Sequence, residues 1–335
     1  MGVPRCFVPF SQQSANQPPA FMSQTFKALQ LVEFGGADAF QFAELPLPTP
    51  GPGQVLVAIR AIGTNPVDFK TRQGKGMASR YPGGLPFTLG WDVSGTVATA
   101  GAGAGLEVGT DVFGMVNFPV PGGAYATHVL APAAELAPKP GPLTHEQAAA
   151  LPLASLTAYQ ALFEFAGLQA GQTVLVHAAA GGVGHLAVQL AHHLGARVIG
   201  TASARNAEFV RSLGADEVVD YTQQPFEDVV RDVDVVLDAV GGEVARRSVA
   251  VLRSGGVLVS IVGGATAELI AANPHLKAGS ILVRAVPEHL QHIAALAAQG
   301  HLRAEISQAL PLADAWQVHQ QLETGRTRGK IVLVP

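Results

Sequence analysis

A glycine-rich turn between a short apolar run and a helical run constrains the fold of this chain more than any other feature. The run TVLV at 173–176 is typical of a buried strand, and the helical stretch HLAVQLAHHL at 185–194 follows the turn directly. Ala179 stands at the first position of the GxGxxG fingerprint, so the turn alone is a weak signal, and a tight turn without a ligand is the alternative. The order of strand, turn and helix predicts a dinucleotide-binding loop, in which glycines let the backbone approach a pyrophosphate. Its predicted contacts are Ala180, Gly181, Gly182, Val183 and Gly184.

Two patterns divide the rest of the chain. From 27 to about 140, short apolar runs broken by Gly and Pro predict many short strands, as in a compact β-barrel or sandwich. From 143 onward, a capping box of Thr144 and Gln147 precedes Val-rich strands that alternate with helices, which predicts a parallel sheet covered on both faces. Helices are expected from Gly184 to a stop at Gly195, over 206–213 and over 288–299. We predict an α/β fold with a doubly wound domain over 146–286, a β-rich domain over 25–145 that 287–335 completes, and a disordered extension over 1–24.

Composition excludes several classes of protein. Hydrophobic residues make up 48 % of the 335 residues, which is enough for a large core. Lys and Arg number 21 against 25 Asp and Glu, a net charge of −4, so no basic field for nucleic acid is expected. The lone Cys6 leaves no internal disulfide and no site that needs two thiolates. Because no apolar run is long enough for a secretory signal or a membrane span, we expect a cytoplasmic protein without a membrane partner.

The segment after the second strand of the α/β domain indicates which dinucleotide binds. An NAD site usually places Asp or Glu there, about 20 residues after the glycines, to bind the ribose 2′-hydroxyl. Here the strand RVIG ends in TASARN, which carries no carboxylate. The hydroxyl of Ser203 and the guanidinium of Arg205 suit a 2′-phosphate, so NADPH is the expected cofactor. Ser203 as a helix N-cap and Arg205 as a solvated residue are compatible alternatives.

These motifs together resemble the medium-chain dehydrogenase/reductase superfamily and, within it, the zinc-independent NADPH quinone oxidoreductase branch, which is zeta-crystallin-like. The resemblance implies a GroES-like catalytic domain made from both ends of the chain, a Rossmann domain between them, and a homodimer. It covers nearly the whole chain from Lys27 to Pro335. The matching stretches are GTNPVDFKTRQG (63–74), LGWDVSGTV (89–97), EQAAALPLASLTAYQAL (146–162), GQTVLVHAAAGGVG (171–184), TASARN (201–206), SLGADEVVDY (212–221), VLDAVGG (236–242) and RGKIVLVP (328–335).

The same resemblance argues against a metal centre. The positions that hold zinc ligands in the zinc-dependent relatives match Asn65, Trp91 and Leu153, which lack a thiolate or imidazole. Without a Lewis acid, a saturated alcohol is a poor substrate. Quinones, enones and alkenals accept a hydride at an electron-poor carbon and spread the charge onto an oxygen, which a few hydrogen bonds can stabilise. A small quinone or enone is therefore the expected substrate.

Four residues are candidates for the catalytic site by resemblance. Asn65 is expected to face the nicotinamide and the substrate oxygen, or else to order the turn before Pro66. Lys70 is expected to bind a ribose or to support an enolate, unless it is a solvated surface lysine. Trp91 is expected to form a wall of the acceptor pocket or to fill the core. Thr157 is expected to contact the nicotinamide or to bond within its own helix.

A second set of residues is expected to contact the cofactor. By resemblance Tyr221 packs by the 2′-phosphate, and the loops after two further strands pass the ribose and nicotinamide; a strand-end tyrosine and plain turns are the alternatives. Arg326, Arg328 and Lys330 crowd the tail, and we choose Arg328 as the one that reaches the phosphate. The sequence indicates no proton donor. The loop residues predicted at the cofactor are Asp238, Val240, Val262 and Gly263.

The sequence thus predicts an NADPH-dependent, zinc-independent oxidoreductase that transfers a hydride to quinones or other conjugated carbonyls. The stretch NPVDFK is also similar to plant-type enone oxidoreductases, so an enone or alkenal double-bond reductase is the first alternative. A non-catalytic NADPH-binding protein is the second.

Overall fold

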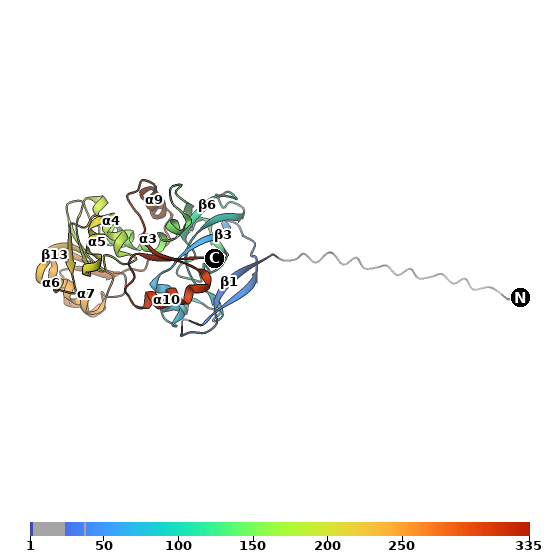
Figure 1. The fold of residues 1–335 in the computed structure, drawn as a ribbon, viewed down its shortest axis with the longest axis horizontal. Coiled ribbons are helices and arrows are strands. Elements are labelled where there is room, and N and C mark those ends of the chain that lie inside the picture. Colours follow the sequence, from blue (N-terminus) through green and yellow to red (C-terminus); the bar gives the residue numbers. More distant parts are fainter. Residues whose placement is uncertain (3–23, 37) are drawn as a thin grey trace.

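The computed structural model describes residues 1–2, 24–36 and 38–335. The extension predicted over 1–24 lies almost wholly outside the described residues. The described chain forms two lobes side by side (Figure 1). One lobe is built on a parallel sheet and the other is β-rich, so the predicted fold class is confirmed. No helix in the described part of the chain is both long enough and apolar enough to cross a membrane.

The first lobe is a six-stranded parallel sheet with the order β11-β10-β9-β12-β13-β14. In chain order this is 3-2-1-4-5-6, the doubly wound Rossmann arrangement. The central strand is buried at Val174, Leu175 and Val176 because helices cover both faces of the sheet. Since the order reverses at β9, ligands bind outside the carboxyl end of this strand. The strands are β9 (Thr173–Val176), β10 (Arg197–Ala202), β11 (Glu217–Asp220), β12 (Val233–Asp238), β13 (Leu252–Ser260) and β14 (Lys277–Ser280), and the helices are α4 (Gly184–Leu194), α5 (Ala207–Ser212), α6 (Phe226–Val229), α7 (Gly242–Ser248) and α8 (Ala267–Ala272).

The second lobe contains a seven-stranded sheet and a three-stranded sheet. The larger has the order β15-β16-β3-β5-β6-β8, with β7 also paired to β3, and the smaller has the order β2-β1-β4. The strands are β1 (Thr25–Leu31), β2 (Phe40–Pro46), β3 (Gln54–Gly63), β4 (Phe87–Thr88), β5 (Asp92–Ala100), β6 (Asp111–Met115), β7 (His128–Pro132), β8 (Leu136–Pro138), β15 (Ile306–Pro311) and β16 (Lys330–Val334), with helices α1 (Pro66–Arg72) and α10 (Ala315–Glu323).

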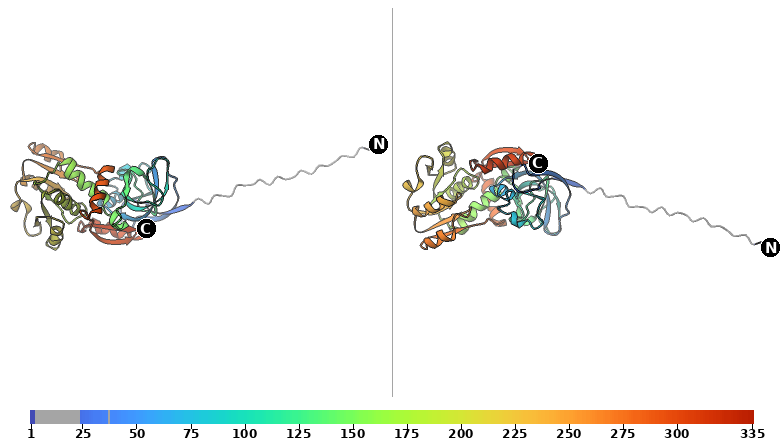
Figure 2. Two further views of the ribbon diagram at one scale, coloured as in Figure 1. Left: turned by 90° about the horizontal axis from the view of Figure 1, so that it is seen from above. Right: turned by 90° about the horizontal axis from the view of Figure 1, so that it is seen from below.

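The end of the chain returns to the β-rich lobe. Strand β16 pairs antiparallel with β3, with Val332 opposite Gly63 and Leu333 opposite Ile62. The last segment, drawn in red, accordingly lies beside the blue strands in Figures 1 and 2. Just before β16, the Gly329 N–H donates to the Ala180 carbonyl at 2.8 Å. The tail is thus held against the glycine-rich loop at the boundary between the lobes.

The ends of several helices follow the pattern expected from the sequence. Gln147 N–H donates to Thr144 Oγ1 at 3.2 Å and Thr144 N–H to Gln147 Oε1 at 2.9 Å, which confirms the capping box. Helix α4 ends at Gly195 with φ +88°, as predicted for a left-handed C-terminal glycine. The helix predicted over 206–213 begins instead as a 3₁₀ turn and becomes α5. The junction helices are α2 (His145–Ala149), α3 (Pro152–Tyr159), which continues as a π-helical segment over Gln160–Phe165, and α9 (Pro287–Ala298).

We predict that Gly184→Ala destabilises the protein by about 1–3 kcal/mol, because a Cβ there overpacks the loop. That Cβ lies 2.2 Å from the carbonyl oxygen of Ala178, which the turn holds in place. At Gly182 the nearest atom to an added Cβ is Lys330 Cδ at 3.5 Å, so Gly182→Ala is the matched control. Chemical denaturation of both variants checks the prediction, and equal unfolding midpoints contradict it.

Candidate active site

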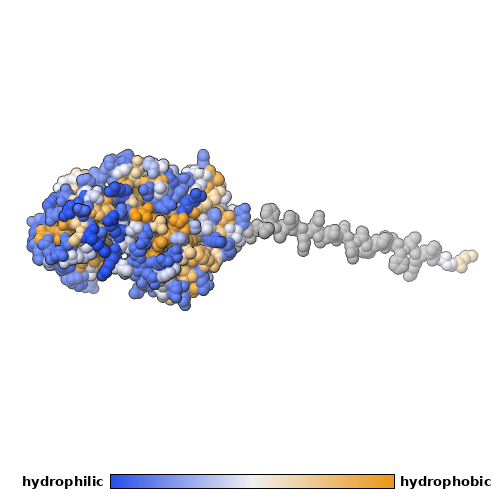
Figure 3. Space-filling view, in the orientation of Figure 1, coloured by the Kyte–Doolittle hydropathy of each residue, from blue (hydrophilic) through white to orange (hydrophobic). Residues whose placement is uncertain are grey.

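A cleft runs along the glycine-rich loop and consists of two adjoining cavities. The larger, here called the Ser203 cavity, has a volume of about 410 Å³, and the smaller, the Asn65 cavity, about 220 Å³. The space-filling view in Figure 3 shows a notch in the outline of the molecule between the two lobes. Both cavities share four lining residues, which makes the cleft continuous: Ala178, Gly181, Gly325 and Thr327.

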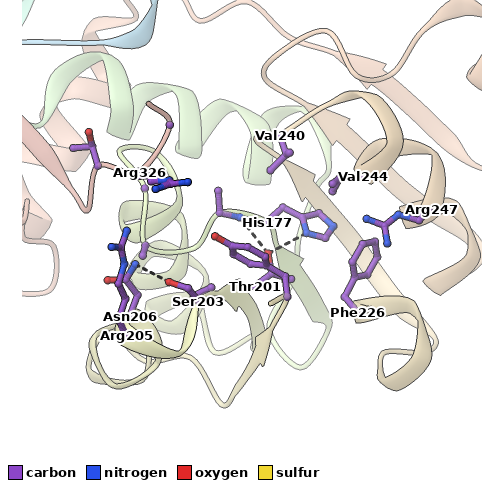
Figure 4. Close-up of a pocket in the computed structure, with 17 residues that line it drawn as sticks. His177, Thr201, Ser203, Arg205, Asn206, Phe226, Val240, Val244, Arg247 and Arg326 are labelled. Atoms are coloured by element: carbon purple, nitrogen blue, oxygen red, sulfur yellow. Dashed lines mark hydrogen bonds between the residues drawn. The ribbon is translucent and has the colours of Figure 1, made fainter. Parts of the chain in front are cut away.

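The Ser203 cavity lies at the carboxyl ends of β10 and β11. Ser203 and Arg205 follow β10 directly, and Tyr221 follows β11, so parallel strands bring these side chains to one edge of the sheet. Arg326 enters from the tail and faces Ser203 and Arg205 across the cavity (Figure 4). Its described lining carries no carboxylate, and neither Arg205 nor Arg326 forms an ion pair within the described residues. The cavity therefore suits a phosphate group.

A neutral histidine forms part of the wall of the Ser203 cavity. His177 is buried, and one ring nitrogen lies 3.2 Å from Thr201 Oγ1 (Figure 4). The other ring nitrogen lies 2.9 Å from Ser248 Oγ. Burial lowers the pKa of His177 to about 4. The imidazole is thus uncharged at neutral pH, and the positive charge of the cavity comes from its arginines.

The glycine-rich loop forms the wall between the two cavities. Ala180 and Gly181 line the Ser203 cavity, and Gly181, Gly182, Val183 and Gly184 line the Asn65 cavity. A Cβ at Gly182 has no atom closer than 3.5 Å, so the backbone here is open to a close-lying group. An open backbone at the start of α4 fits a pyrophosphate, and the arginines beyond it fit a 2′-phosphate. These residues suit NADPH.

The Asn65 cavity lies where the loop meets the β-rich lobe. Asn65 directly precedes helix α1, which Pro66 begins, and its side chain is buried. The Asn65 amide is held from two sides: its Nδ2 donates to Asp92 Oδ2 at 2.9 Å and its Oδ1 accepts from Lys330 Nζ. Apolar side chains form much of the remaining lining, which includes Leu153, Ala154, Ala239, Ile261 and Val262.

Three ionisable groups are buried together beneath this cavity. Asp92 Oδ1 accepts from the Leu153 N–H at 2.8 Å, and its other oxygen lies 3.9 Å from Lys330 Nζ. Asp68 Oδ2 accepts from the Asn65 N–H at 2.7 Å and from the Tyr125 hydroxyl at 3.2 Å. Burial raises the pKa of Asp68 to about 7 and that of Asp92 to about 6, although Lys330 opposes both shifts. Burial also lowers the pKa of Lys330, against the attraction of the two carboxylates.

The residues present do not fit a zinc ion. Asn65 already bonds to an ammonium and a carboxylate, and Leu153 offers no donor side chain. Trp91 is wholly buried, packs against Phe118, and donates its Nε1–H to the Val120 carbonyl at 2.8 Å. Within the described residues, no three His, Cys, Asp or Glu side chains form a group that suits a metal.

Three of the four predicted catalytic residues lie outside the lining of both cavities. Trp91 fills the core, as its alternative interpretation had it. Thr157 donates its hydroxyl to the Leu153 carbonyl at 2.7 Å, a bond within its own helix. Lys70 is half-buried on α1. Asn65 alone of the four lines a cavity, and a contact of any of them with a substrate stays a prediction.

The predicted cofactor residues divide in the same way. The glycine-rich loop, Ser203, Arg205, Tyr221, Val240 and Val262 all line the cleft. Asp238 lies beneath it, where its Oδ1 accepts from the N–H groups of Val240 and Gly241 at 2.9 and 2.7 Å. Gly263, with φ +80°, shapes the turn after Val262 without lining either cavity.

Among the tail cations, the structure favours a different residue from the one we chose. Arg328 forms an ion pair with Glu305 at 2.5 Å and lies over the Phe209 ring, 4.3 Å from its centroid, so it does not line the cleft. Arg326 lines the Ser203 cavity and Lys330 lines the Asn65 cavity. The sequence shows three cations in this tail, but it does not show which of them point into the cleft.

A parallel 3-2-1-4-5-6 sheet, a glycine-rich loop and a β-rich lobe across a cleft define a two-domain, dinucleotide-binding dehydrogenase or reductase fold. Two family models match this chain: an alcohol dehydrogenase GroES-like domain over residues 51–141 and a zinc-binding dehydrogenase over residues 213–333. The chain belongs to the medium-chain dehydrogenase/reductase superfamily, which confirms the resemblance found in the sequence. The second description mentions zinc, which the donor set of this chain does not fit.

Individual relatives cover nearly all of the chain. A 2-methylene-furan-3-one reductase of Solanum lycopersicum is 36% identical, with 92% of this chain and 79% of the relative aligned. The solved quinone oxidoreductase of Coxiella burnetii is 38% identical with a TM-score of 0.88, over 93% of this chain and 100% of that one. The Escherichia coli quinone oxidoreductase, solved in complex with NADPH, is 29% identical with a TM-score of 0.83, over 92% of this chain and 100% of that one.

We predict that Arg326→Ala weakens NADPH binding about 10-fold or more and NADH binding far less, since a hydrogen bond to a charged group contributes about 1.5–3 kcal/mol. Arg328→Ala is the comparison, because Arg328 pairs with Glu305 outside the cleft lining. Fluorescence titration with each cofactor measures both affinities. A larger loss of NADPH affinity in the Arg328 variant contradicts the assignment of Arg326 and supports Arg328, the residue predicted from the sequence.

The raised pKa of Asp68 makes the stability of the protein depend on pH. Because its pKa is raised to about 7 in the folded chain, the folded protein binds this proton more tightly than the unfolded chain does. The contribution of Asp68 to stability therefore falls as pH rises from about 4 to about 7 and is constant above that. We predict that the free energy of unfolding, compared with that of Asp68→Asn, declines across this window. His177, which lies outside this cluster, titrates in both proteins and cancels, whereas Asp92 titrates beside Asp68 and contributes to the slope in both. A pH-independent difference contradicts the prediction.

Proposed function

We propose that this protein is an NADPH-dependent reductase that transfers a hydride to quinones or other conjugated carbonyls. The observation that carries the proposal is the continuous cleft, which joins an arginine-lined end to a buried amide and ammonium across a glycine-rich loop. The names of the relatives support it, because they include an enone reductase and quinone oxidoreductases. A small conjugated carbonyl is thus the proposed substrate.

NADPH, when bound, supplies the hydride. Ser203, Arg205 and Arg326 hold the 2′-phosphate, and the loop N–H groups at the start of α4 hold the pyrophosphate. Asn65 and the apolar side chains of its cavity hold the acceptor and exclude water, which strengthens every electrostatic interaction on the acceptor oxygen. Positive charge and amide dipoles at this end suit a substrate whose negative charge develops on oxygen.

Quinones and enones are two alternative classes of acceptor for this cleft. The identity of the tomato relative favours reduction of an enone double bond as the alternative within the same chemistry. In both reactions the hydride goes to a conjugated carbon and the charge goes to oxygen, so the same cleft suits both. A protein that binds NADPH without catalysis is the remaining alternative.

We also propose that the protein acts in the cytoplasm and that it forms a homodimer. Strand β14 ends the parallel sheet, and its outer edge has no partner strand within the described residues. A free edge of this kind supports an assembly that joins the sheets of two copies. Sedimentation at micromolar concentration measures the oligomeric state.

We predict that chelator-treated protein oxidises NADPH under anaerobic conditions with an ortho-quinone, a para-quinone or a simple enone, and leaves a saturated aldehyde unreduced. Spectrophotometry of NADPH follows all four reactions. The ratio of quinone to enone turnover distinguishes a quinone reductase from an enone reductase. Activity that needs added zinc contradicts the proposal. Tight NADPH binding without turnover on any of the four selects the non-catalytic alternative.

A further inference from the structure

Lys330 spans the boundary between the two lobes. Its Cδ lies 3.5 Å from the position of a Cβ at Gly182, so its stem lies against the glycine-rich loop. Its ammonium reaches the β-rich lobe, where Nζ donates to the Thr64 carbonyl at 2.8 Å and to Asn65 Oδ1. The residue is only 3 % exposed and lines the Asn65 cavity. Lys330 thus places a cation at the end of the cleft where the proposed acceptor lies.

The hydrogen bonds of the Lys330 ammonium use two of its three N–H groups. An ammonium has three N–H groups, and two of them donate to Thr64 and Asn65. The nearest carboxylate oxygen, Asp92 Oδ2, lies at 3.9 Å, beyond hydrogen-bond reach. Within the described residues the third N–H thus has no acceptor. A neutral amine at this position keeps both hydrogen bonds and holds a lone pair in place of the third N–H, so the same geometry satisfies both protonation states.

The surroundings of Lys330 act on its proton in opposite directions. Burial lowers the pKa of Lys330, whereas Asp92 on β5 and Asp68 on α1 both raise it. His185 on α4 also faces Lys330, but burial lowers its pKa to about 4, so it is neutral near pH 7. The ammonium is therefore favoured by the nearby carboxylates, of which Asp92 forms an ion pair with it, and disfavoured by its own burial, a balance that suits proton transfer.

We propose that Lys330 is the general acid of the reduction, the group that gives a proton to the oxygen of the reduced acceptor. This inference rests on the proposed function. The hydride forms a C–H bond at the β-carbon of an enone, the π electrons move toward the carbonyl oxygen, and NADPH is oxidised as the acceptor is reduced. The third N–H of Lys330 breaks as an O–H bond forms on that oxygen. Water that enters when the product leaves returns a proton to the amine.

Lys330→Arg tests the proton apart from the charge. Arginine stays protonated at all accessible pH, so it keeps a cation beside Asp92 but is a very poor acid. General acid catalysis contributes about 10²–10⁴-fold, so enone turnover is expected to fall by about 100-fold or more. NADPH affinity, measured by fluorescence, is expected to stay within a few fold. Lys139→Arg is the matched control, since Lys139 Nζ also donates to a backbone carbonyl, Leu143 at 2.7 Å, but lies outside the cleft.

The pH profile separates acid catalysis from structural support. In the wild type, kcat/KM for the enone is expected to fall as pH rises through the pKa of Lys330, because only the protonated amine donates. This alkaline limb is expected to be absent from the residual activity of Lys330→Arg. A solvent isotope effect on wild-type turnover that disappears in the variant supports the same step.

Chemical rescue keeps the inference testable if arginine does not fit the buried site. In Lys330→Ala, methylammonium is expected to restore enone turnover, whereas tetramethylammonium, which has the charge but no N–H, is not. Equal rescue by both ions, or wild-type turnover with an unchanged alkaline limb in Lys330→Arg, overturns the role of Lys330 alone. A wild-type protein that turns over no conjugated acceptor overturns the proposed function itself, before any variant is compared.

Discussion

Two buried carboxylates and one buried ammonium lie close together beneath the Asn65 cavity, and the arrangement of the cleft depends on this cluster. Asp92 fixes Asn65 through Nδ2 and the start of α3 through the Leu153 N–H, while Lys330 holds Asn65 through Oδ1. Burying charges is costly unless they are paired and hydrogen-bonded, so removing one partner leaves the others uncompensated. The cluster therefore sets both the position of the amide that lines the cleft and the protonation of the groups behind it.

This arrangement also brings positive charge to the cleft without a metal ion. A Lewis acid stabilises developing negative charge on oxygen, and it needs thiolate or imidazole ligands to hold it. Here a side chain of the protein itself brings positive charge to the same end of the cleft, and the amide of Asn65 bonds to that side chain. Because an ammonium stabilises charge less strongly than a metal ion does, the chemistry suits acceptors that already spread the charge by conjugation.

Local signals in the sequence predicted the parts of the structure that local physics determines. The glycine-rich loop, the capping box at Thr144 and the C-terminal glycine of α4 depend on residues a few positions apart, and each was found as expected. The absence of a carboxylate after β10 pointed to Ser203 and Arg205, which line the cleft, and their contact with a 2′-phosphate stays a prediction. For these elements the spacing of residue types along the chain is sufficient.

Contacts between distant segments cannot be predicted from the spacing of residue types along the chain. Whether Arg326 or Arg328 points into the cleft depends on the pairing of β16 with β3 and on the Glu305 carboxylate, which no spacing rule supplies. The position of Trp91 in the core likewise depends on the packing of Phe118 against it. The sequence shows Lys330 only as one of three tail cations, because its partners Thr64 and Asn65 lie more than two hundred positions away.

The pairing of the last strand with β3 has a consequence for how the protein is made. The Thr64 hydroxyl donates to the Ile331 carbonyl across 267 positions of sequence, so this contact forms only after Ile331 has left the ribosome. The Rossmann sheet draws all its strands from 173–280 and can form while the chain is still being synthesised. The nascent protein can thus form its dinucleotide-binding loop before its active site is complete, and a chain terminated before Lys330 lacks a residue that lines the cleft.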